Sequence, residues 1–278
     1  MTWIAGALVF WGLAWAANVR IAASRSRLAR IAVPVLFGVT ILVLWEGLVR
    51  GLGVSPVILP PPTAIAAEIA DSGAVLWGDF VQTVVRGALS GLAIGAAAAI
   101  ATAIAVDRFA FLRRGLLPIG NFVAALPIVG LAPILVMWFG FGWQSKAAVV
   151  VAMVFFPILL NAVAGLQATD RMQRDLMATW GAGWWPALWR LRLPAAMPFV
   201  FNGLKIASTL ALIGAIVAEF FGGPTQGMGF RISTEANVLN LTMVWAQIAV
   251  AALAGSLLYG AIVLVERRVT FWHPSQRT

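Results

Sequence analysis

Apolar runs long enough to cross a membrane are the feature of this sequence that most restricts its fold. A bilayer core of about 30 Å is crossed by about 20 helical residues, and a crossing helix satisfies its own backbone hydrogen bonds. The sequence therefore predicts an all-α membrane protein, a polytopic helix bundle. Seven segments meet the requirement: Trp3–Val19, Ile31–Val49, Val84–Val106, Leu116–Phe139, Ala147–Leu166, Phe199–Phe221 and Met243–Val265.

The composition supports a membrane protein and excludes several other classes. Hydrophobic residues make up 62% of the chain and charged residues 10%, against roughly 25% charged residues in soluble domains. The net charge of +9 does not indicate a nucleic-acid partner, because the arginines lie in short links between apolar runs. Cysteine is absent and His273 is the only histidine, so we expect no disulfide and no metal site.

The distribution of basic residues among the links predicts the orientation in the membrane, since cytoplasmic links are rich in Lys and Arg. Lys205 lies within the sixth segment and belongs to neither side. We expect a multi-pass protein of the cell (inner) membrane with its N-terminus outside, its C-terminus cytoplasmic and residues 167–198 in the cytosol. Arginine clusters occupy alternate links, at residues 20–30, 108–114, 171–192 and 267–277. The opposite links hold isolated basic residues: Arg50, Arg86, Lys146 and Arg231.

The link DLMATWGAGWWPALWRLRLP (175–194) is long and rich in tryptophan. Gly181-Ala182-Gly183 and Pro186 argue against one continuous helix, so we predict two short helices joined by a bend, with Pro186 near the start of the second. We call residues 171–194 the elbow. At 100° per residue, its apolar side chains fall on one face: Leu176, Trp180, Trp184, Ala187, Leu188 and Leu191.

The elbow has two interpretations. It is either a helix pair lying on the lipid headgroups, with tryptophans in the aromatic belt, or a docking element that fits a groove on a soluble partner. The pattern alone favours the first.

The spacing within the elbow resembles the cytoplasmic loop of ABC-importer permeases, whose motif reads Glu-Ala-Ala, three residues, Gly, nine residues, Ile, any residue, Leu-Pro. Here Gly181 is followed by nine residues and then Leu191-Arg192-Leu193-Pro194, while Asp175-Leu176-Met177 stand in place of Glu-Ala-Ala. Other segments resemble, in order, the permeases of nitrate, sulfonate, taurine and pyrimidine-precursor importers: ILPPPTAI (58–65), TVVRGALSGLAIG (83–95), ALPIVGLAPILVMWFGFG (125–142), FFPILLNAVAGL (155–166), LPAAMPFVFNGLKIA (193–207) and VAEFFGGPTQGMGFRI (217–232).

The resemblance covers about residues 45–268 and implies six core transmembrane helices, to which residues 3–19 add an extra N-terminal one. It implies four parts: an N-terminal helix and basic link (1–30), a second helix and periplasmic segment (31–82), the permease core (83–268) and a cytoplasmic tail (269–278).

The resemblance also implies a function. In that family two permease subunits form the pathway, a cytosolic ATPase dimer drives it and an external solute-binding protein delivers the solute. The second permease is either the same chain or a paralogue. The implied solute is a small organic or anionic molecule, such as a sulfonate, taurine, nitrate or a pyrimidine or vitamin precursor. The elbow is implied to dock on the ATPase through Asp175, Leu176, Met177, Gly181, Trp184, Leu188, Leu191, Leu193 and Pro194.

We expect no enzymatic activity and no cofactor on this chain, because it lacks the phosphate-binding pattern G-x-x-x-x-G-K-[ST]. ATP and Mg are expected on the partner ATPase. Two alternatives from other classes fit less well. An intramembrane hydrolase needs a nucleophile and a base, but His273 is in the tail and Ser90 lacks a glycine two residues before it. A passive channel does not explain the spacing of the elbow.

Several polar residues in the apolar segments are candidates for the pathway, because such groups need a partner or a ligand in the bilayer. They are Asn161, Asn202, Ser208, Thr209 and Gln247. Hydrogen bonding between helices is the favoured role for each one taken singly. Glu219 is also a candidate, although a hydrogen bond to the Gly-rich turn that follows it is favoured over substrate contact.

Three further predictions concern charged residues and prolines. Glu46 and Arg50, spaced i,i+4, are predicted to form a structural pair. Arg86 is assigned either to an anionic substrate or to lipid headgroups. Pro127 and Pro133 are expected to kink the fourth segment.

Overall fold

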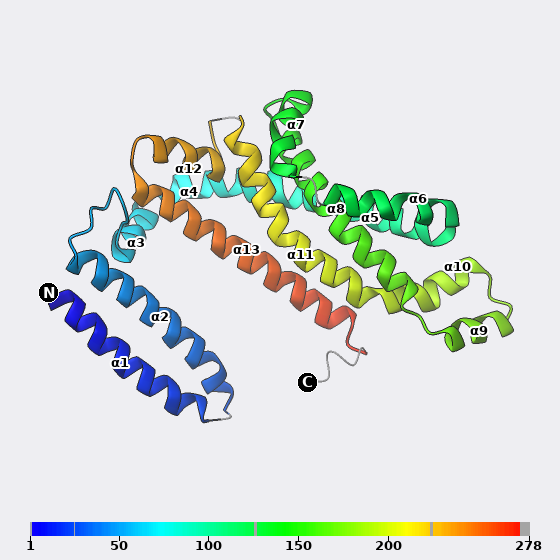
Figure 1. Cartoon of the computed structure of the whole chain (residues 1–278), viewed down its shortest axis with the longest axis horizontal. Helices are drawn as coiled ribbons and strands as arrows, with labels where there is room; N and C mark the ends of the chain where they lie inside the picture. Colours follow the sequence, from blue (N-terminus) through cyan, green and yellow to red (C-terminus); the bar gives the residue numbers. More distant parts are fainter. Residues whose placement is uncertain (1, 25, 125–126, 223–224, 273–278) are drawn as a thin grey trace. The chain divides into compact units, whose positions relative to one another are not determined.

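The computed structural model describes residues 2–24, 26–124, 127–222 and 225–272, and all regular structure within these ranges is helical. The all-α fold is therefore confirmed (Figure 1). The chain forms two compact units. Unit 1 comprises Met1–Leu76 with Ile232–Ala249, and unit 2 comprises Trp77–Arg231 with Val250–Thr278.

Six helices in the described part of the chain are long and apolar enough to cross a membrane. They coincide with six of the seven predicted segments, including the N-terminal one. Several begin earlier than predicted, because the flanking residues continue the helix. They are Thr2–Ala22, Leu28–Gly51, Gly73–Arg108, Trp143–Gln167, Trp184–Phe220 and Leu241–Val269.

The fourth predicted segment, 116–139, is not a single helix. Helix α6 (Ala110–Ala124) ends within it, and a short 3-10 helix, η2 (Ile128–Leu131), leads into α7 (Ala132–Phe139), which covers its last part. Pro127 immediately precedes η2, and Pro133 occupies the first turn of α7, where no backbone N–H is needed. The two prolines thus divide this segment rather than kink one helix.

Unit 1 is built on a hairpin of α1 (Thr2–Ala22) and α2 (Arg27–Gly51). Ser26 caps α2 by accepting a hydrogen bond from the Ala29 N–H at 3.1 Å. Near the open end of the hairpin the two helices lie close, since a methyl group at Gly47 would lie 3.0 Å from the Trp3 carbonyl oxygen. Small residues permit such approach between membrane helices. The unit also contains α3 (Pro62–Asp71).

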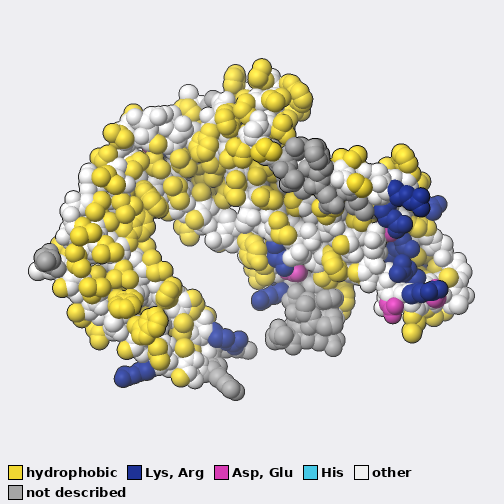
Figure 2. Space-filling model, viewed as in Figure 1, with side chains coloured by type: hydrophobic (Ala, Val, Ile, Leu, Met, Phe, Trp, Pro, Cys, Tyr) yellow, Lys and Arg dark blue, Asp and Glu magenta, His cyan; other side chains and the backbone are white. Residues whose placement is uncertain are grey.

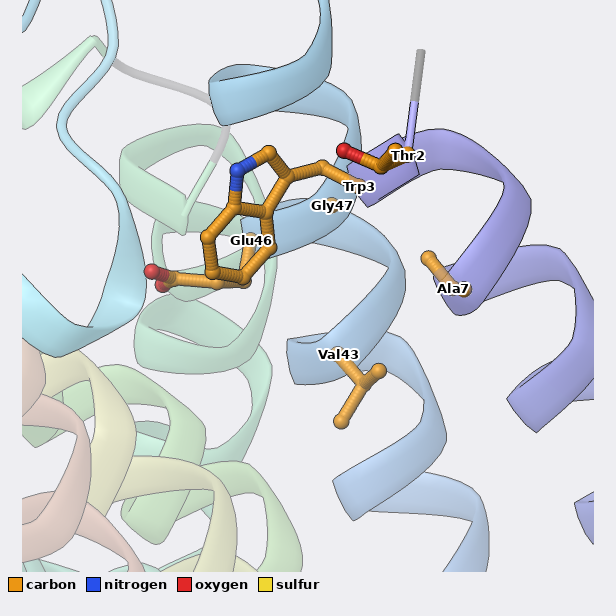
Figure 3. Close-up of a pocket in the computed structure, with 7 residues that line it drawn as sticks. Thr2, Trp3, Ala7, Val43, Glu46 and Gly47 are labelled. Carbon is orange, nitrogen blue, oxygen red and sulfur yellow. The ribbon is translucent and has the colours of Figure 1, made fainter.

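A cavity of ≈ 430 Å³ lies between α1 and α2 and is lined by Trp3, Val43 and Glu46 among others (Figure 3). Glu46 forms an ion pair with Arg50, as predicted, and both side chains hydrogen-bond Thr63 at the start of α3. The Thr63 N–H also donates to Glu46 at 3.0 Å. This pair therefore fastens α3 to the end of α2, which is the structural role that the sequence predicts.

The core of unit 2 is a layer of three long helices, α5 (Ser90–Arg108), α8 (Trp143–Gln167) and α11 (Leu193–Phe220). Alanine and valine fill it, and glycine allows the backbones to approach. A methyl group at Gly91 would lie 2.9 Å from the Ala147 carbonyl oxygen, and one at Gly203 would lie 3.2 Å from the Ile158 Cα. Close packing of small residues takes the place of a water-driven hydrophobic core in a membrane protein.

The remaining helices extend this layer. Helix α4 (Gly73–Phe80) and the π-helical η1 (Val81–Leu89) precede α5, forming one continuous helix with it. The elbow contains α9 (Arg171–Thr179), α10 (Trp184–Ala187) and the π-helical η3 (Leu188–Arg192), which runs directly into α11. Helices α12 (Met228–Asn237) and α13 (Leu241–Val269) follow, and the unit boundary falls within both. Of the predicted tail, residues 273–278 lie outside the described residues.

Candidate functional site

The elbow has the predicted form of two helices joined by a bend. The backbone N–H of Asp170 donates to the Gln173 side chain at 3.2 Å and so helps to start α9. Helix α9 ends in a turn in which Gly181 has φ +69°, a left-handed conformation that favours glycine. The Ala182 N–H closes this turn on the Met177 carbonyl at 3.0 Å. Pro186 lies in the first turn of α10, as predicted.

The α9 half of the elbow presents its side chains to the outside. Asp175 is exposed, and its ion pair with Arg171, at 3.9 Å, lies between two solvent-exposed groups. Leu176 is 53% exposed and Trp180 is 75% exposed. Gly181 is exposed as well, whereas Met177 is half-buried. Exposed large apolar residues on a short helix are typical of a surface that meets a partner or lipid.

The α10 half of the elbow differs from the prediction of one continuous apolar face. Leu188 is 0% exposed and belongs to the core of unit 2, with Trp184 and Leu193 packed against that core. Leu191 and Pro194 are half-buried. The bend at Gly181 separates the face of α9 from that of α10, so the predicted stripe is split. Leu188 is thus a packing residue in this structure and is not available on an outer docking surface.

Asp107, at the end of α5, attaches the elbow to the helix bundle. Its Oδ2 accepts a hydrogen bond from Arg192 Nη1 at 2.5 Å and another from the Trp184 indole Nε1 at 3.2 Å. The guanidinium of Arg108 lies over the Trp184 ring, 5.4 Å from its centroid. No local spacing in the sequence marks Asp107, because its partners lie far along the chain. We call this contact the elbow joint.

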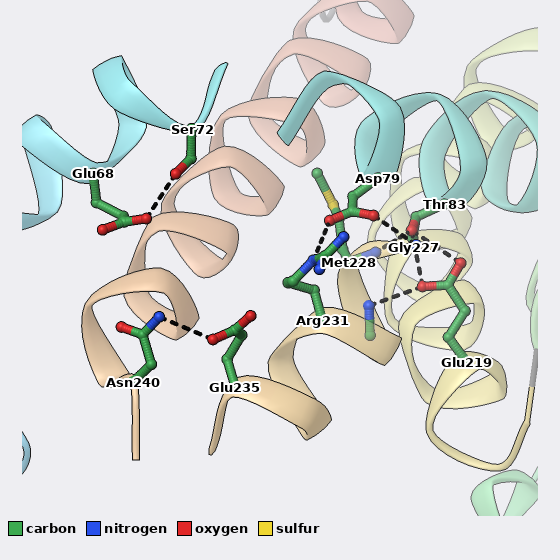
Figure 4. Close-up of polar contacts among 11 residues, drawn as sticks. Glu68, Ser72, Asp79, Thr83, Glu219, Gly227, Met228, Arg231, Glu235 and Asn240 are labelled. Atoms are coloured by element: carbon green, nitrogen blue, oxygen red, sulfur yellow. Dashed lines mark hydrogen bonds and ion pairs between the residues drawn. The ribbon is translucent and has the colours of Figure 1, made fainter. Parts of the chain in front are cut away.

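Glu219 lies at the opposite end of α11 in a buried polar cluster (Figure 4). It is 2% exposed. Its carboxylate accepts hydrogen bonds from the Gly229 N–H at 2.8 Å and from the Thr83 hydroxyl at 2.9 Å. The sequence predicted a bond to the Gly-rich turn that begins at Gly222, whereas the backbone donor in the structure is Gly229, in the first turn of α12. Lys146, fully buried in the first turn of α8, is close enough for its charge to interact with that of Glu219.

The same cluster holds the start of α12 through three successive backbone N–H groups. Asp79 accepts a hydrogen bond from the Gly227 N–H at 2.8 Å, and Thr83 accepts one from the Met228 N–H at 2.7 Å. Glu219 accepts the third, from the Gly229 N–H. Asp79 also forms an ion pair with Arg231 at 3.0 Å. The first N–H groups of a helix lack partners within the helix, and here they are capped by distant side chains. We call this cluster the α12 joint. No local pattern marks Asp79 or Thr83, because the groups they bind lie far along the chain.

The pathway candidates fall into two groups. Asn202 donates to Asn161 at 3.0 Å, and Asn161 donates to the Pro157 carbonyl at 2.8 Å, so this pair links α11 to α8. Ser208 is 1% exposed and donates to the Lys205 carbonyl. Thr209 is exposed and donates to the Ile206 carbonyl. Gln247, in unit 1, is fully buried.

The candidates on α11 divide between two sides of that helix. Ser208 and Glu219 lie on the packed side of α11, so neither faces an open route in this structure. Asn202 and Thr209 lie on the exposed side of α11. Ile206 and Ile213 share that side, because residues three or four apart lie on one face of a helix. This exposed stripe has hydrogen-bonding groups and no charge.

The other basic residues take mainly structural positions. Lys205, which the link pattern did not assign, forms an ion pair with Glu266 of α13 at 3.0 Å. Arg86 is exposed on η1 and donates to Gln82 at 3.4 Å. Within the described residues, no cluster of three or more His, Asp or Glu residues could hold a metal ion.

Comparison with known proteins identifies the family. The family model described as "binding-protein-dependent transport system inner membrane component" matches residues 91–271. The formylaminopyrimidine transport permease of Halalkalibacterium halodurans is 33% identical over 247 residues, covering 87% of this chain and 96% of the relative. The riboflavin transport system permease of Chloroflexus aurantiacus is 30% identical over 237 residues, covering 84% and 88%.

The taurine transport system permease of Escherichia coli is 27% identical over 235 residues, covering 79% of this chain and 82% of the relative. The family match includes both the elbow and α11, and the similarity to these relatives spans most of each chain. With six long apolar helices and an elbow of the expected spacing, the chain belongs to the family of ABC-transporter permeases that are inner membrane components of binding-protein-dependent transport systems.

Proposed function

We propose that this chain is the membrane subunit of an ATP-driven importer and that α9 is its contact with a cytosolic ATPase dimer. The observation that carries the proposal is the division of the elbow into an outward half and an anchored half. Leu176 and Trp180 project from α9, while Leu188 of η3 is buried in the bundle. A partner that binds α9 can therefore move helices that are fixed to α10.

The elbow joint supports this mechanical role. Because Asp107 binds Arg192 and Trp184, the end of α5 is tied to the segment that continues into α11. A displacement of α9 would reach both helices at once, and packed helices move as rigid bodies between discrete arrangements. ATP and Mg would bind the ATPase and favour one arrangement of the helices. An external solute-binding protein would favour the other. This chain would then act without chemistry of its own.

The solute pathway is proposed along the exposed stripe of α11, opposite a second permease subunit, which is either the same chain or a paralogue. Asn202 and Thr209 supply hydrogen-bonding groups there, and Ile206 and Ile213 supply apolar surface. Such a lining suits a small organic solute with polar groups on an apolar body. The relatives named for formylaminopyrimidine and riboflavin transport are consistent with a heterocyclic vitamin precursor.

The orientation is proposed from the arginine distribution, with the elbow in the cytosol, the N-terminus outside and the C-terminus inside. The exposed arginines at the end of α5, in α6 and in the elbow all belong to unit 2. They would lie on the cytoplasmic face by the positive-inside rule.

The docking proposal is tested with two single variants, each of which replaces one exposed tryptophan of the elbow by alanine. Trp180 of α9 is 75% exposed and Trp189 of η3 is 65% exposed, so Trp180→Ala and Trp189→Ala remove similar side chains. The affinity-tagged chain is purified from native membranes, and the co-purified ATPase is quantified by mass spectrometry. Trp180→Ala should lower ATPase recovery about ten-fold, which is the size of an interface hot spot. Trp189→Ala should leave it unchanged, and equal recovery with both variants contradicts the proposal.

A further inference from the structure

A small hollow lies inside the bend of the elbow, on a different side from Leu176 and Trp180. Its volume is ≈ 220 Å³, and both helices of the elbow contribute to its wall. Met177 and Leu191 are among its apolar lining residues, and Arg174 and Arg192 are its charged ones. Two cations beside an apolar wall form a setting for an anion that carries an apolar body.

The two arginines are not fully satisfied by the protein. Arg192 uses Nη1 to bind Asp107, but its Nε is buried and has no hydrogen-bond partner among the described residues. A buried donor without an acceptor is costly. Arg174 is exposed and makes no ion pair in the described part of the chain. The Arg192 Nε is closed to solvent, so the free donors at the hollow are those of exposed Arg174, beside the guanidinium of Arg192 that Asp107 partly occupies.

The surroundings of the hollow indicate the depth of the lipid headgroups. Figure 2 shows Lys and Arg atoms gathered over the part of unit 2 that carries α6, α9 and α10. Exposed aromatic side chains lie on α6, α10 and η3, including Phe111, Trp185 and Trp189. Arginine and tryptophan at the ends of membrane helices are typical of the membrane interface. The exposed arginines are Arg108, Arg113, Arg114, Arg171, Arg174 and Arg190.

We propose that the hollow binds the phosphate group of an anionic phospholipid, with Arg174 and Arg192 as its donors. A bound phosphate would connect α9 to η3 and hold the angle of the elbow. The ligand's glycerol and acyl carbons would lie against Met177 and Leu191. Helix α10 continues into the membrane helix α11, so a lipid can reach the hollow from the bilayer. This inference rests on the proposed cytosolic position of the elbow at the membrane surface.

Lipid binding is tested on the purified chain alone, so that the result does not depend on ATPase docking. The detergent-solubilised protein is titrated with phosphatidylglycerol or phosphatidylcholine, and bound lipid is counted by native mass spectrometry. Arg174→Gln should weaken phosphatidylglycerol binding about five-fold, as expected for one arginine at an anionic surface. Arg171→Gln, the same change on the same helix outside the hollow, is the matched control and should leave binding unchanged.

A second variant and a competition assay keep the test decisive. Arg192→Lys keeps a cation beside Asp107 but removes the guanidinium at the wall of the hollow, so it should also weaken phosphatidylglycerol binding. Equal weakening by Arg171→Gln and Arg174→Gln would show a diffuse charge effect and overturn the site. Displacement of the lipid by millimolar inorganic phosphate would assign the hollow to a free anion instead. Loss of bound lipid when the ATPase binds would assign the arginines to that partner.

Discussion

The elbow joint and the α12 joint tie the same two long helices together at opposite ends, but they do so through different donors. At the elbow joint, Asp107 accepts hydrogen bonds from two side chains, Arg192 and Trp184. At the α12 joint, Asp79, Thr83 and Glu219 hold three successive backbone N–H groups. From Thr83 to Asp107 the helix covers roughly 35 Å at about 1.5 Å per residue. That length spans the hydrocarbon core, so we infer that the joints lie near opposite faces of the membrane.

This difference indicates which joint can move. A contact made by side chains alone can shift by rotation about side-chain torsions, so the elbow can change its angle while α5 and α11 stay intact. Moving α12 away from the α12 joint would leave buried backbone N–H groups and two carboxylates without partners, which is costly. We therefore expect α12 to move with η1 and α11 as one body, and the elbow to be the adjustable end.

The largest expected effect is the loss of stability when the Glu219 carboxylate is removed. Glu219→Ala removes the acceptor for Gly229 and Thr83 and leaves buried Lys146 without its nearby negative charge. It should lower the free energy of unfolding by about 3 kcal/mol, measured by thermal unfolding in detergent micelles. Glu219→Gln keeps a carbonyl acceptor for Gly229 and should be less harmful. Wild-type stability of Glu219→Ala would show that the α12 joint does not hold this end of the bundle.

A smaller loss of stability is expected at the elbow joint. Asp107→Ala should cost about 1 to 3 kcal/mol, because it leaves partly buried Arg192 and Trp184 without an acceptor. ATP-driven uptake by membrane vesicles should fall by more than the loss of stability accounts for, since the link between α5 and the elbow is lost. Asp107→Glu keeps the carboxylate and should restore most of the uptake. If Asp107→Ala transports as well as wild type, motion does not pass through this joint.

A still smaller effect is expected from the bend itself. Gly181 and Gly183 both have open space where a Cβ would lie, but only Gly181 has positive φ. Gly181→Ala should therefore cost about 1 kcal/mol, and the matched Gly183→Ala should cost less. Unfolding of the two variants in detergent measures the difference. A larger loss for Gly183→Ala would mean that backbone conformation at Gly181 does not determine the bend.

The two joints can be assigned to membrane faces without any loss of stability. The chain has no cysteine, so single cysteines can be placed at exposed Ala110, beside the elbow joint, and at exposed Thr225, beside the α12 joint. A membrane-impermeant thiol reagent added to intact cells should label Thr225→Cys and leave Ala110→Cys unlabelled. Ser24→Cys should be protected and Ser72→Cys labelled. The reverse pattern would invert the proposed orientation.

Local sequence features determined the membrane helices and the form of the elbow. An apolar run of sufficient length forms a helix in a bilayer whatever its neighbours are, so six predicted segments appear as long helices. Gly181 and Pro186 likewise predict a bend and a new helix from backbone geometry alone. The Glu46–Arg50 pair was predictable because an i,i+4 spacing places both side chains on one helix face.

Tertiary structure alone decided which polar groups meet and which apolar groups are covered. Asp107 pairs with Arg192, and Asp79 with Arg231, across long separations in sequence that no periodicity records. Leu188 and Leu176 look equivalent on a helical projection, yet one is buried and the other exposed. The bend at Gly181 turns their faces apart, and only the packing of η3 against the bundle determines which face is covered. Burial depends on neighbours from distant helices, whereas helix formation in a membrane depends on the segment itself.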